Sequence, residues 1–452
     1  MVTTKLFATI AAVILVVSAI GVGIFVLNNN ENTSQRALLG NSLEIYGNAN
    51  GDWTIDEEDV KYVEKIISGE LEESKFSDAN GDGKIDESDI EQIRALINNN
   101  AKFVCLLDGY GGYKRVSTDP KRIAVDQIQI CEFVSIMGVG DRVICGDFPA
   151  SILDEFYFTQ EVRSIGSNAS PDYELIADLE IDMYLTFFTS GYEEKTAKLP
   201  DTDVLYLGLY VTDTLDLENS SFVQAFLKGG YIFNNTDRAE SYVKWMLDIR
   251  DKIADVTTKI SNEDKKTILI STYQSAYWSQ DVLSLSAYLD GDTLGQAAIL
   301  AGARLVTESV STYGTGALSF TTNVEWLAVQ DIDYLFLHTV RLQGNGNEVL
   351  YVPQQGYLFD NRAEFVEKQN QVAELEYAKM CGVTKDNVFL LAGDFRNNCS
   401  SGLLLSAYMC KILYPDLFKN LNPFEIHNEY MEWMGFPDYD TNINGTFIVP
   451  NY

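Results

Sequence analysis

The sequence is poor in histidine, in cysteine and in positive charge, and each shortage excludes a class of function. Only two histidines occur, His338 and His427, which excludes a histidine-rich catalytic or metal site. Six cysteines in 452 residues show no metal-ligand spacing and do not make a disulfide scaffold, so buried thiols are expected. Lys and Arg number 33 against 66 Asp and Glu, and the net charge of -33 argues against binding to nucleic acid or to an anionic membrane surface.

Common catalytic motifs are absent as well. The chain contains no Gly-x-Ser-x-Gly elbow, no Gly-rich phosphate loop with its lysine, and no His-Glu-x-x-His pair. We therefore expect that the protein is not an enzyme. A metal-dependent hydrolase is the weakest alternative, because histidine is scarce and acidic pairs are confined to the loops described below.

A long uncharged run lies near the N-terminus. Leu6 to Leu27 is 22 residues without a charge, which as a helix spans about 33 Å, enough for a bilayer core. Lys5 precedes the run, which favours an N-terminus inside and a body outside the cell. A cleaved signal peptide is the alternative, although the run is longer than a usual signal core. We expect a single-pass anchor in the cell membrane with the body on the extracellular side.

Two acidic loops, thirty residues apart, follow the N-terminal segment. Oxygen-bearing side chains occupy positions 1, 3, 5, 9 and 12 of each loop, the spacing with which a twelve-residue loop wraps Ca²⁺. Each loop runs into an apolar-periodic stretch that predicts a helix. Counting position 7, which ligates through its backbone, the predicted calcium ligands are Asn48, Asn50, Asp52, Thr54, Asp56 and Asp59 in the first loop and Asp78, Asn80, Asp82, Lys84, Asp86 and Asp89 in the second.

The two loops differ in how well they fit a calcium site. The second has Gly83 at position 6, where the turn needs a residue without a Cβ, whereas the first has Trp53 there. The first loop also begins with the neutral Asn48, so its affinity should be weaker. The alternative for both is a solvated acidic turn without metal, which is a closer rival for the first loop. Asp at position 12, in place of Glu, resembles dockerin loops.

The remainder of the chain has an α/β pattern. Short apolar strands alternate with helical stretches, which is typical of layers around a parallel sheet. Asp237 to Ile260 is free of Pro and Gly and predicts one long amphipathic helix between two strand series. The expected strands are 122–125, 142–145, 182–187 and 204–207 before this helix, and 267–270, 334–337 and 388–391 after it.

Several segments, in their order and spacing, resemble substrate-binding proteins of the ABC importers for iron-siderophores, haem and vitamin B12. The similarity covers about residues 103–435, and the combination with the anchor and the dockerin-like loops resembles archaeal members. Ile181 and Ile332 replace the proline that usually precedes the strand Asp in this family. The segments that carry the resemblance are 119–125, 136–143, 171–182, 291–302, 323–333 and 407–416.

The resemblance implies an α/β fold of two Rossmann-like lobes joined by one long helix. A small all-α dockerin/EF-hand-like domain and a transmembrane helix precede the lobes. It further implies capture of a metal chelate and its delivery to a permease driven by an ATPase. The expected division is 1–28 anchor, 29–42 tether, 43–100 dockerin-like calcium-binding domain, 103–236 N-lobe, 237–260 interlobe helix and 261–452 C-lobe.

The predicted ligand contacts follow the strand ends, because open α/β sheets present their ligand loops there. Aromatic faces with a few cations suit a planar or chelated anionic ligand. For each residue, packing within a lobe is an equally good explanation, and for His338 so is a backbone hydrogen bond at a strand end. The candidates are Gln127, Phe148, Tyr192, Tyr273, Tyr277, Trp278, His338, Arg341 and Arg396, with Tyr277, Trp278 and Arg341 the strongest.

Two carboxylates align with the docking glutamates that the resembled family carries, one on each lobe. They are Glu174 and Glu325, and ordinary solvated helix charge is the alternative. The rival function is a calcium-dependent cell-surface assembly protein, whose dockerin-like domain would bind a cohesin-like partner. A permease and ATPase encoded beside the gene would favour transport, and a cohesin-bearing partner would favour assembly.

Overall fold

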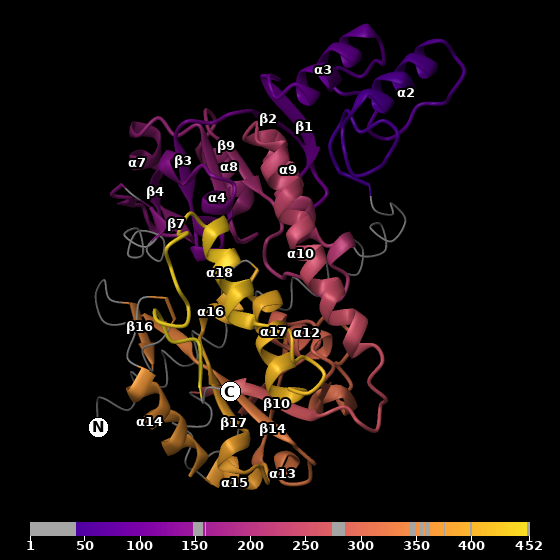
Figure 1. Ribbon diagram of the computed structural model, residues 1–452. Coiled ribbons are helices and arrows are strands. Elements are labelled where there is room, and N and C mark those ends of the chain that lie inside the picture. The colour runs from indigo at the N-terminus through magenta and orange to yellow at the C-terminus, as the bar shows by residue number, and fades with distance from the viewer. Residues whose placement is uncertain are drawn as a thin grey trace.

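The computed structural model describes residues 42–147, 157–158, 160–273, 285–343, 349–352, 356–357, 362–374, 376–397 and 400–449. Two α/β lobes lie one above the other, and a helix pair caps the upper lobe (Figure 1). The predicted anchor, Leu6–Leu27, and the tether lie outside the described residues. Within the described ranges, no helix has both the length and the apolar character that crossing a bilayer requires.

The N-lobe is built on a parallel sheet of five strands in the order β5-β4-β3-β8-β9. The three central strands are fully or largely buried, as expected for a sheet covered on both faces. The four strands predicted for this lobe are confirmed. The sheet consists of β3 (Ile123–Val125), β4 (Val143–Gly146), β5 (Arg163–Ser164), β8 (Met183–Thr186) and β9 (Asp203–Tyr206), and its helices are α4 (Ile128–Ile136), α7 (Tyr173–Asp178) and α8 (Tyr192–Lys198).

The C-lobe sheet has the order β13-β11-β10-β14-β17-β18, with β12 paired to β10. Its predicted strands correspond to β10, β14 and β17, which run parallel, whereas β11, β13 and β18 pair antiparallel. The strands are β10 (Thr267–Thr272), β11 (Leu285–Tyr288), β12 (Arg304–Leu305), β13 (Ser319–Thr322), β14 (Tyr334–His338), β17 (Val388–Leu391) and β18 (Ile448–Val449). The helices are α12 (Thr293–Leu300), α13 (Val324–Leu327), α14 (Arg362–Ala373), α15 (Glu376–Met380), α16 (Asp394–Asn397), α17 (Ser401–Leu413) and α18 (Pro423–Trp433).

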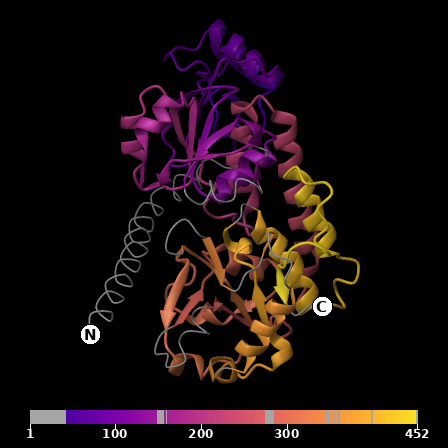
Figure 2. The same ribbon diagram turned by 90° about the vertical axis from the view of Figure 1, so that its left-hand side faces the viewer.

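One long helix, α10 (Thr236–Thr257), joins the lobes, close to the predicted 237–260. It runs along the side of both lobes in Figures 1 and 2 and contacts α9 (Ser221–Ile232) as well as α12 and α17. Its buried side chains recur at helical spacing and form one stripe. They are Ala239, Tyr242, Val243, Met246, Ile249, Ile253 and Thr257.

The helix pair consists of α2 (Glu57–Ile67) and α3 (Glu87–Ile97), as the apolar periodicity predicted. Each helix begins with a capping box, made by Asp56 with Asp59 and by Asp86 with Asp89. The pair is not isolated, because its apolar residues belong to the same buried cluster as the core of the N-lobe. A backbone bridge between Ile45 and Leu106 closes the junction.

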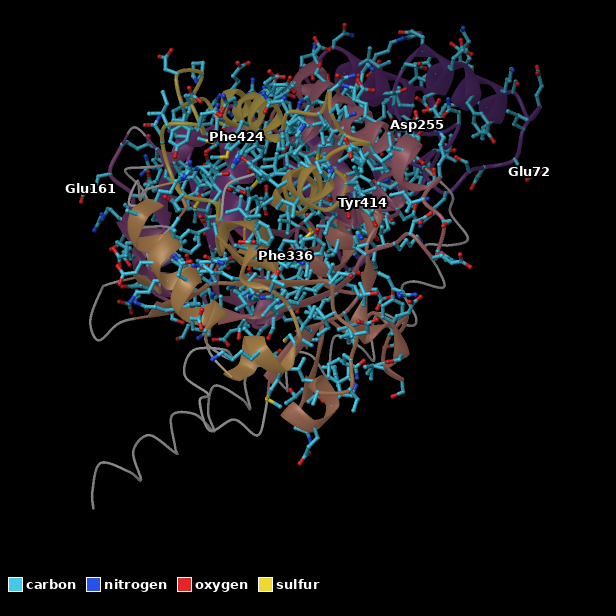
Figure 3. The ribbon with its side chains drawn as sticks, turned by 60° about the horizontal axis from the view of Figure 1, so that its bottom comes forward. Glu72, Glu161, Asp255, Phe336, Tyr414 and Phe424 are labelled. Atoms are coloured by element: carbon cyan, nitrogen blue, oxygen red, sulfur yellow. The ribbon has the colours of Figure 1, made fainter. Side chains whose placement is uncertain are left out.

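Several small strands were not predicted. A hairpin of β1 (Phe103–Leu107) and β2 (Tyr113–Ser117) connects the helix pair to the N-lobe, and short pairs lie at the lobe margins. These margin pairs are β6 (Gly166–Ser167) with β7 (Ser170–Pro171), and β15 (Val340–Gln343) with β16 (Val349–Val352). The acidic residues Glu72, Glu161 and Asp255 lie at the periphery, whereas Phe336 and Tyr414 lie inside (Figure 3).

Candidate functional site: the facing strand ends of the two lobes

The N-lobe strand ends carry a strained residue. Gln127 directly follows β3 and has a φ of 66° and a ψ of 157°, a backbone conformation that residues other than glycine rarely adopt. Its backbone N–H donates to Asp147 Oδ1 at 3.0 Å, and its side-chain amide donates to Asp147 Oδ2 at 3.2 Å. Asp147 follows the neighbouring strand β4, so the two strand ends are tied together. Gln127, a predicted ligand contact, therefore has a strained backbone that its hydrogen bonds to Asp147 hold in place.

A buried ion pair lies beside Gln127. Lys195 Nζ contacts Asp126 Oδ2 at 2.9 Å, and the two side chains are 1% and 0% exposed. Asp126 also accepts from the Thr186 hydroxyl at 2.7 Å and from the Phe187 backbone N–H, while Lys195 reaches the same hydroxyl at 2.8 Å. Because these partners lie at the ends of β3 and β8 and in α8, the pair fixes the loops that follow both strands.

The C-lobe strand ends carry a charged cluster. Arg396, in α16, contacts Asp292 Oδ2 through Nε at 2.9 Å and through Nη2 at 2.8 Å. Asp292 also caps α12 by accepting from the Leu294 N–H. The guanidinium lies 5.1 Å from the centre of the Tyr288 ring, a cation–π distance. The Arg396 side chain remains 29% exposed, so this predicted contact residue reaches a surface, but Asp292 already neutralises its charge.

The lobes meet near this cluster. Burial raises the pKa of Tyr210, which follows β9 of the N-lobe; Arg396 lowers it and Asp292 raises it, so Tyr210 lies within their electrostatic reach. Tyr210 stacks on Phe187 with ring centres 5.4 Å apart. The Thr214 N–H donates to the Gln296 side chain at 3.1 Å. The arrangement joins aromatic rings of the N-lobe to a paired arginine of the C-lobe.

Three predicted contact residues are buried inside the lobes. His338 is 1% exposed and its Nε2 lies 3.3 Å from the Tyr288 hydroxyl; burial lowers its pKa to about 3, so it is neutral. Tyr273 is 1% exposed within the C-lobe core. Tyr192 donates its hydroxyl to Asp108 at 3.0 Å inside the N-lobe. These three are corrections, because at a strand end core packing takes a large ring as readily as a ligand does.

His427 is a further correction. Its place in a polar C-terminal helix indicated a surface residue, but it is 0% exposed. Its Nε2 lies 2.8 Å from the Tyr357 hydroxyl and its Nδ1 lies 3.0 Å from the Tyr408 hydroxyl. Burial lowers its pKa to about 3.

The remaining predicted contacts are Phe148, Tyr277, Trp278 and Arg341. The first three lie outside the described residues, and Arg341 is in β15, where only the backbone is described. The sequence reasoning missed Tyr210, Tyr288 and Asp292. Asp292 could have been found as the Asp before an apolar helical run, which is an N-cap signal.

The loops before α2 and α3 fold tightly on their own oxygens. Asn50 and Asp52 accept from backbone N–H groups two residues further on. At position 12, Asp59 and Asp89 are fully buried and each accepts two backbone N–H bonds. Burial raises the pKa of Asp59 to about 6, although the N–H groups of Asn50 and Asp56 lower it.

Asn48, at position 1 of the first loop, has an orphaned oxygen. Its amide nitrogen donates to the carbonyls of Leu43 at 2.9 Å and Asp52 at 2.7 Å, which fixes the orientation of the amide. The residue is 0% exposed, and its Oδ1 has no hydrogen-bond partner among the described residues. The predicted ligands Asn50, Thr54, Asp78, Asn80 and Asp86 are half-buried, whereas Asp52, Asp56, Asp82 and Lys84 are exposed.

The two predicted docking carboxylates occupy equivalent places. Glu174 lies in the first turn of α7, which leads into β8, and Glu325 lies in the first turn of α13, which leads into β14. Both are exposed. Each lobe therefore presents an exposed glutamate from a short helix that precedes a strand of its parallel core.

No family model matches the sequence, and no curated protein matches it either. Solved structures do match. The TroA-like periplasmic binding protein FepB of Veillonella parvula is similar over 77% of this chain and 99% of its own, at 12% identity and a TM-score of 0.58. The molybdate-binding protein MolA of Haemophilus influenzae is similar over 73% of this chain and 97% of its own, at 14% identity and a TM-score of 0.51. CeuE of Helicobacter pylori, solved with Ni(II) bound, is similar over 75% of this chain and 98% of its own, at 15% identity and a TM-score of 0.50. At these identities the similarity shows the fold, which is that of two-lobed periplasmic binding proteins.

Proposed function

We propose that this chain is the extracellular substrate-binding protein of an ABC importer, and that it delivers a metal chelate to a permease driven by an ATPase. The observation that carries the proposal is the pair of α/β lobes connected by the long helix α10, whose strand-end loops meet near Arg396. Ligands of open α/β sheets bind at such ends. The similarity to solute-binding proteins along almost their whole length supports the same reading.

The chelate is proposed from the chemistry of these strand ends. Tyr210 is half-buried and lies within the electrostatic reach of Arg396, which is paired with Asp292 and lies over the buried Tyr288 ring. An aromatic ring with little free charge beside it suits a ligand with apolar surface and a shielded metal better than a small free oxyanion. Tyr277, Trp278 and Arg341 are proposed as further contacts, in which the rings cover the chelate and the arginine pairs with a peripheral acid.

Native mass spectrometry of protein purified from its own cells tests the proposal, followed by titration with haem, corrinoids, ferric siderophores and molybdate. A bound coloured chelate should quench tryptophan fluorescence, and Trp278→Phe should remove most of that quenching. Arg341→Gln should weaken binding roughly tenfold if the arginine pairs with an acid. Binding of molybdate alone would refute the chelate but leave the transport reading. Binding of no small molecule would refute both.

We also propose that the loops 48–59 and 78–89 bind Ca²⁺. The fully buried carboxylates of Asp59 and Asp89 and the orphaned Oδ1 of Asn48 are the donor types that a hard cation prefers. Calcium would neutralise the buried acids and satisfy the asparagine oxygen. Calorimetric titration of the full-length protein should show heat at millimolar Ca²⁺ or below. Asp82→Ala should weaken binding more than Asp52→Ala, because the second loop has four carboxylates at its side-chain ligand positions and the first has three. Absence of any heat would refute the site.

Membrane anchoring by Leu6–Leu27 is proposed from the sequence. Carbonate washing should leave the protein in the membrane pellet, and a mature N-terminus near residue 30 would refute the anchor. For the surface-assembly alternative, the described residues offer no supporting observation. The inner side of the helix pair is packed against the N-lobe, and its outer side is charged.

A further inference from the structure

One face of α9 contacts the first acidic loop, 48–59, and the segment before it, 42–44. Gln224, Lys228 and Tyr231 stand at i, i+4 and i+7 of the helix, so they lie on one face. All three are nearly fully buried, at 7%, 1% and 5% exposure. Such burial of a lysine and a glutamine requires partners, and these partners lie far away in sequence.

Gln224 and Lys228 hold residues 42–44. The Gln224 amide donates to the Ser42 carbonyl at 3.0 Å and accepts from the Glu44 N–H at 3.1 Å. Lys228 Nζ contacts Glu44 Oε2 at 2.6 Å. On its other side the same segment is bonded to the loop, because the Leu43 N–H donates to the Asp52 carbonyl at 2.7 Å.

Tyr231 reaches the loop itself. Its hydroxyl accepts from the Ile55 N–H at 2.9 Å. Ile55 stands between positions 7 and 9, from which Thr54 and Asp56 would ligate calcium. The tyrosine therefore fixes the backbone between two proposed ligands, and the Leu43 and Asp52 carbonyls fix Asn48.

We propose that Gln224, Lys228 and Tyr231 are positioning residues of the first calcium loop, so that calcium binding and the order of α9 are thermodynamically linked. This inference rests on the proposed calcium site and deepens it. The first loop has three carboxylates at its side-chain ligand positions and the second has four. Preorganisation by α9 makes up for part of that shortage. By reciprocity, bound Ca²⁺ protects α9 to the same extent that α9 raises the affinity of the loop.

Calorimetry of the full-length protein tests the first half of the linkage. Tyr231→Phe removes only the acceptor of the Ile55 N–H and should weaken one calcium site roughly three- to tenfold. Tyr414→Phe is the control: its hydroxyl accepts the Lys266 N–H at the same 2.9 Å and also donates to the Gly302 carbonyl, but it lies in the C-lobe. It should leave calcium affinity unchanged. Equal affinity in wild type and Tyr231→Phe would overturn the proposal.

Hydrogen exchange tests the second half. Adding Ca²⁺ to the wild type should slow exchange of the α9 amides, and Asp52→Ala should abolish this protection. Asp82→Ala, in the second loop, should retain it. Calcium binding without protection of α9 would overturn the linkage while leaving the calcium site intact, whereas a wild type that binds no calcium would overturn both. Gln224→Met, which keeps the side-chain size and loses both hydrogen bonds, serves if Tyr231→Phe does not fold.

Discussion

At the scale of single residues, the buried pair of Asp126 and Lys195 makes the sharpest stability prediction. Lys195→Met leaves the Asp126 carboxylate buried without its counter-charge, and we expect a loss of about 3–5 kcal/mol in the free energy of unfolding, measured in urea. As a comparison, Lys244→Met breaks the pair with Asp248, whose side chains are 76% and 54% exposed. It should change the free energy of unfolding by less than about 0.5 kcal/mol.

A double variant separates the lost charge partner from lost packing. Asp126→Asn combined with Lys195→Met removes both charges, and should recover most of the stability that Lys195→Met loses. If the double variant is no more stable than the single one, packing of the lysine stem and not charge explains the loss.

The neutral His427 predicts a pH dependence. Its pKa lies near 3 in the folded protein and near 6.5 in the unfolded chain, so below pH 6.5 the unfolded chain binds the extra proton. Stability should therefore fall as the pH falls from 6.5 toward 3, by up to roughly 1.4 kcal/mol per pH unit for this residue. His427→Gln should have a shallower slope in urea unfolding between pH 4.5 and 6.5. An unchanged slope would contradict this assignment.

Residue roles were the least predictable part of the site. Of the residues chosen by strand-end position, Gln127 and Arg396 are half-buried, and their contact with a ligand stays a prediction. The same criterion failed for His338 and Tyr192, because the sequence does not show whether a side chain at a strand end turns toward the cleft or back into its lobe. The partner of Arg396, Asp292, lies 104 residues earlier, and no local pattern connects the two.

At the scale of elements, hydrophobic periodicity predicted the long helices and the strands that are buried on both faces of their sheet. All of the strands expected for the lobes, the helix pair and α10 are present within a few residues of their predicted ends. Most of the missed strands lie at sheet edges or in two-stranded pairs, where half-exposed residues give little alternation, but β11, which lies between β10 and β13, was missed as well. The contact of residues 42–44 and the first acidic loop with α9 was also missed, since it joins residues about 180 positions apart.

The equivalent placement of α7 and α13 carries a prediction for transport. Glu174→Lys with Glu325→Lys should leave ligand affinity unchanged and lower uptake, because paired carboxylates facing basic residues steer and orient docking. Glu263→Lys with Glu432→Lys changes the same charge at other exposed positions and should leave uptake intact. Equal uptake by the two double variants would remove this role.

At the scale of the whole molecule, α10 limits the motion between the lobes. It packs on α9 and on α12 and α17, and Tyr242 in its N-terminal half bonds to Ser400 of the C-lobe. We expect ligand binding to raise the free energy of unfolding, by about 2.7 kcal/mol at a hundred times Kd. The radius of gyration in small-angle scattering should barely change. A large compaction would show a hinge that this helix does not provide.

The way in which the chain enters the body has a mechanical consequence. A pull on the chain ahead of Ser42 first reaches residues 42–45, which are fastened to α9 by Gln224 and Lys228 and to β1 by the bridge between Ile45 and Leu106. Tension then passes from α9 into α10 and is shared by both lobes. The first acidic loop is bonded to this fastened segment, whereas α2, the second loop and α3 come after it, so most of the load bypasses them. A body held on a stretched tether would keep its helix pair unloaded.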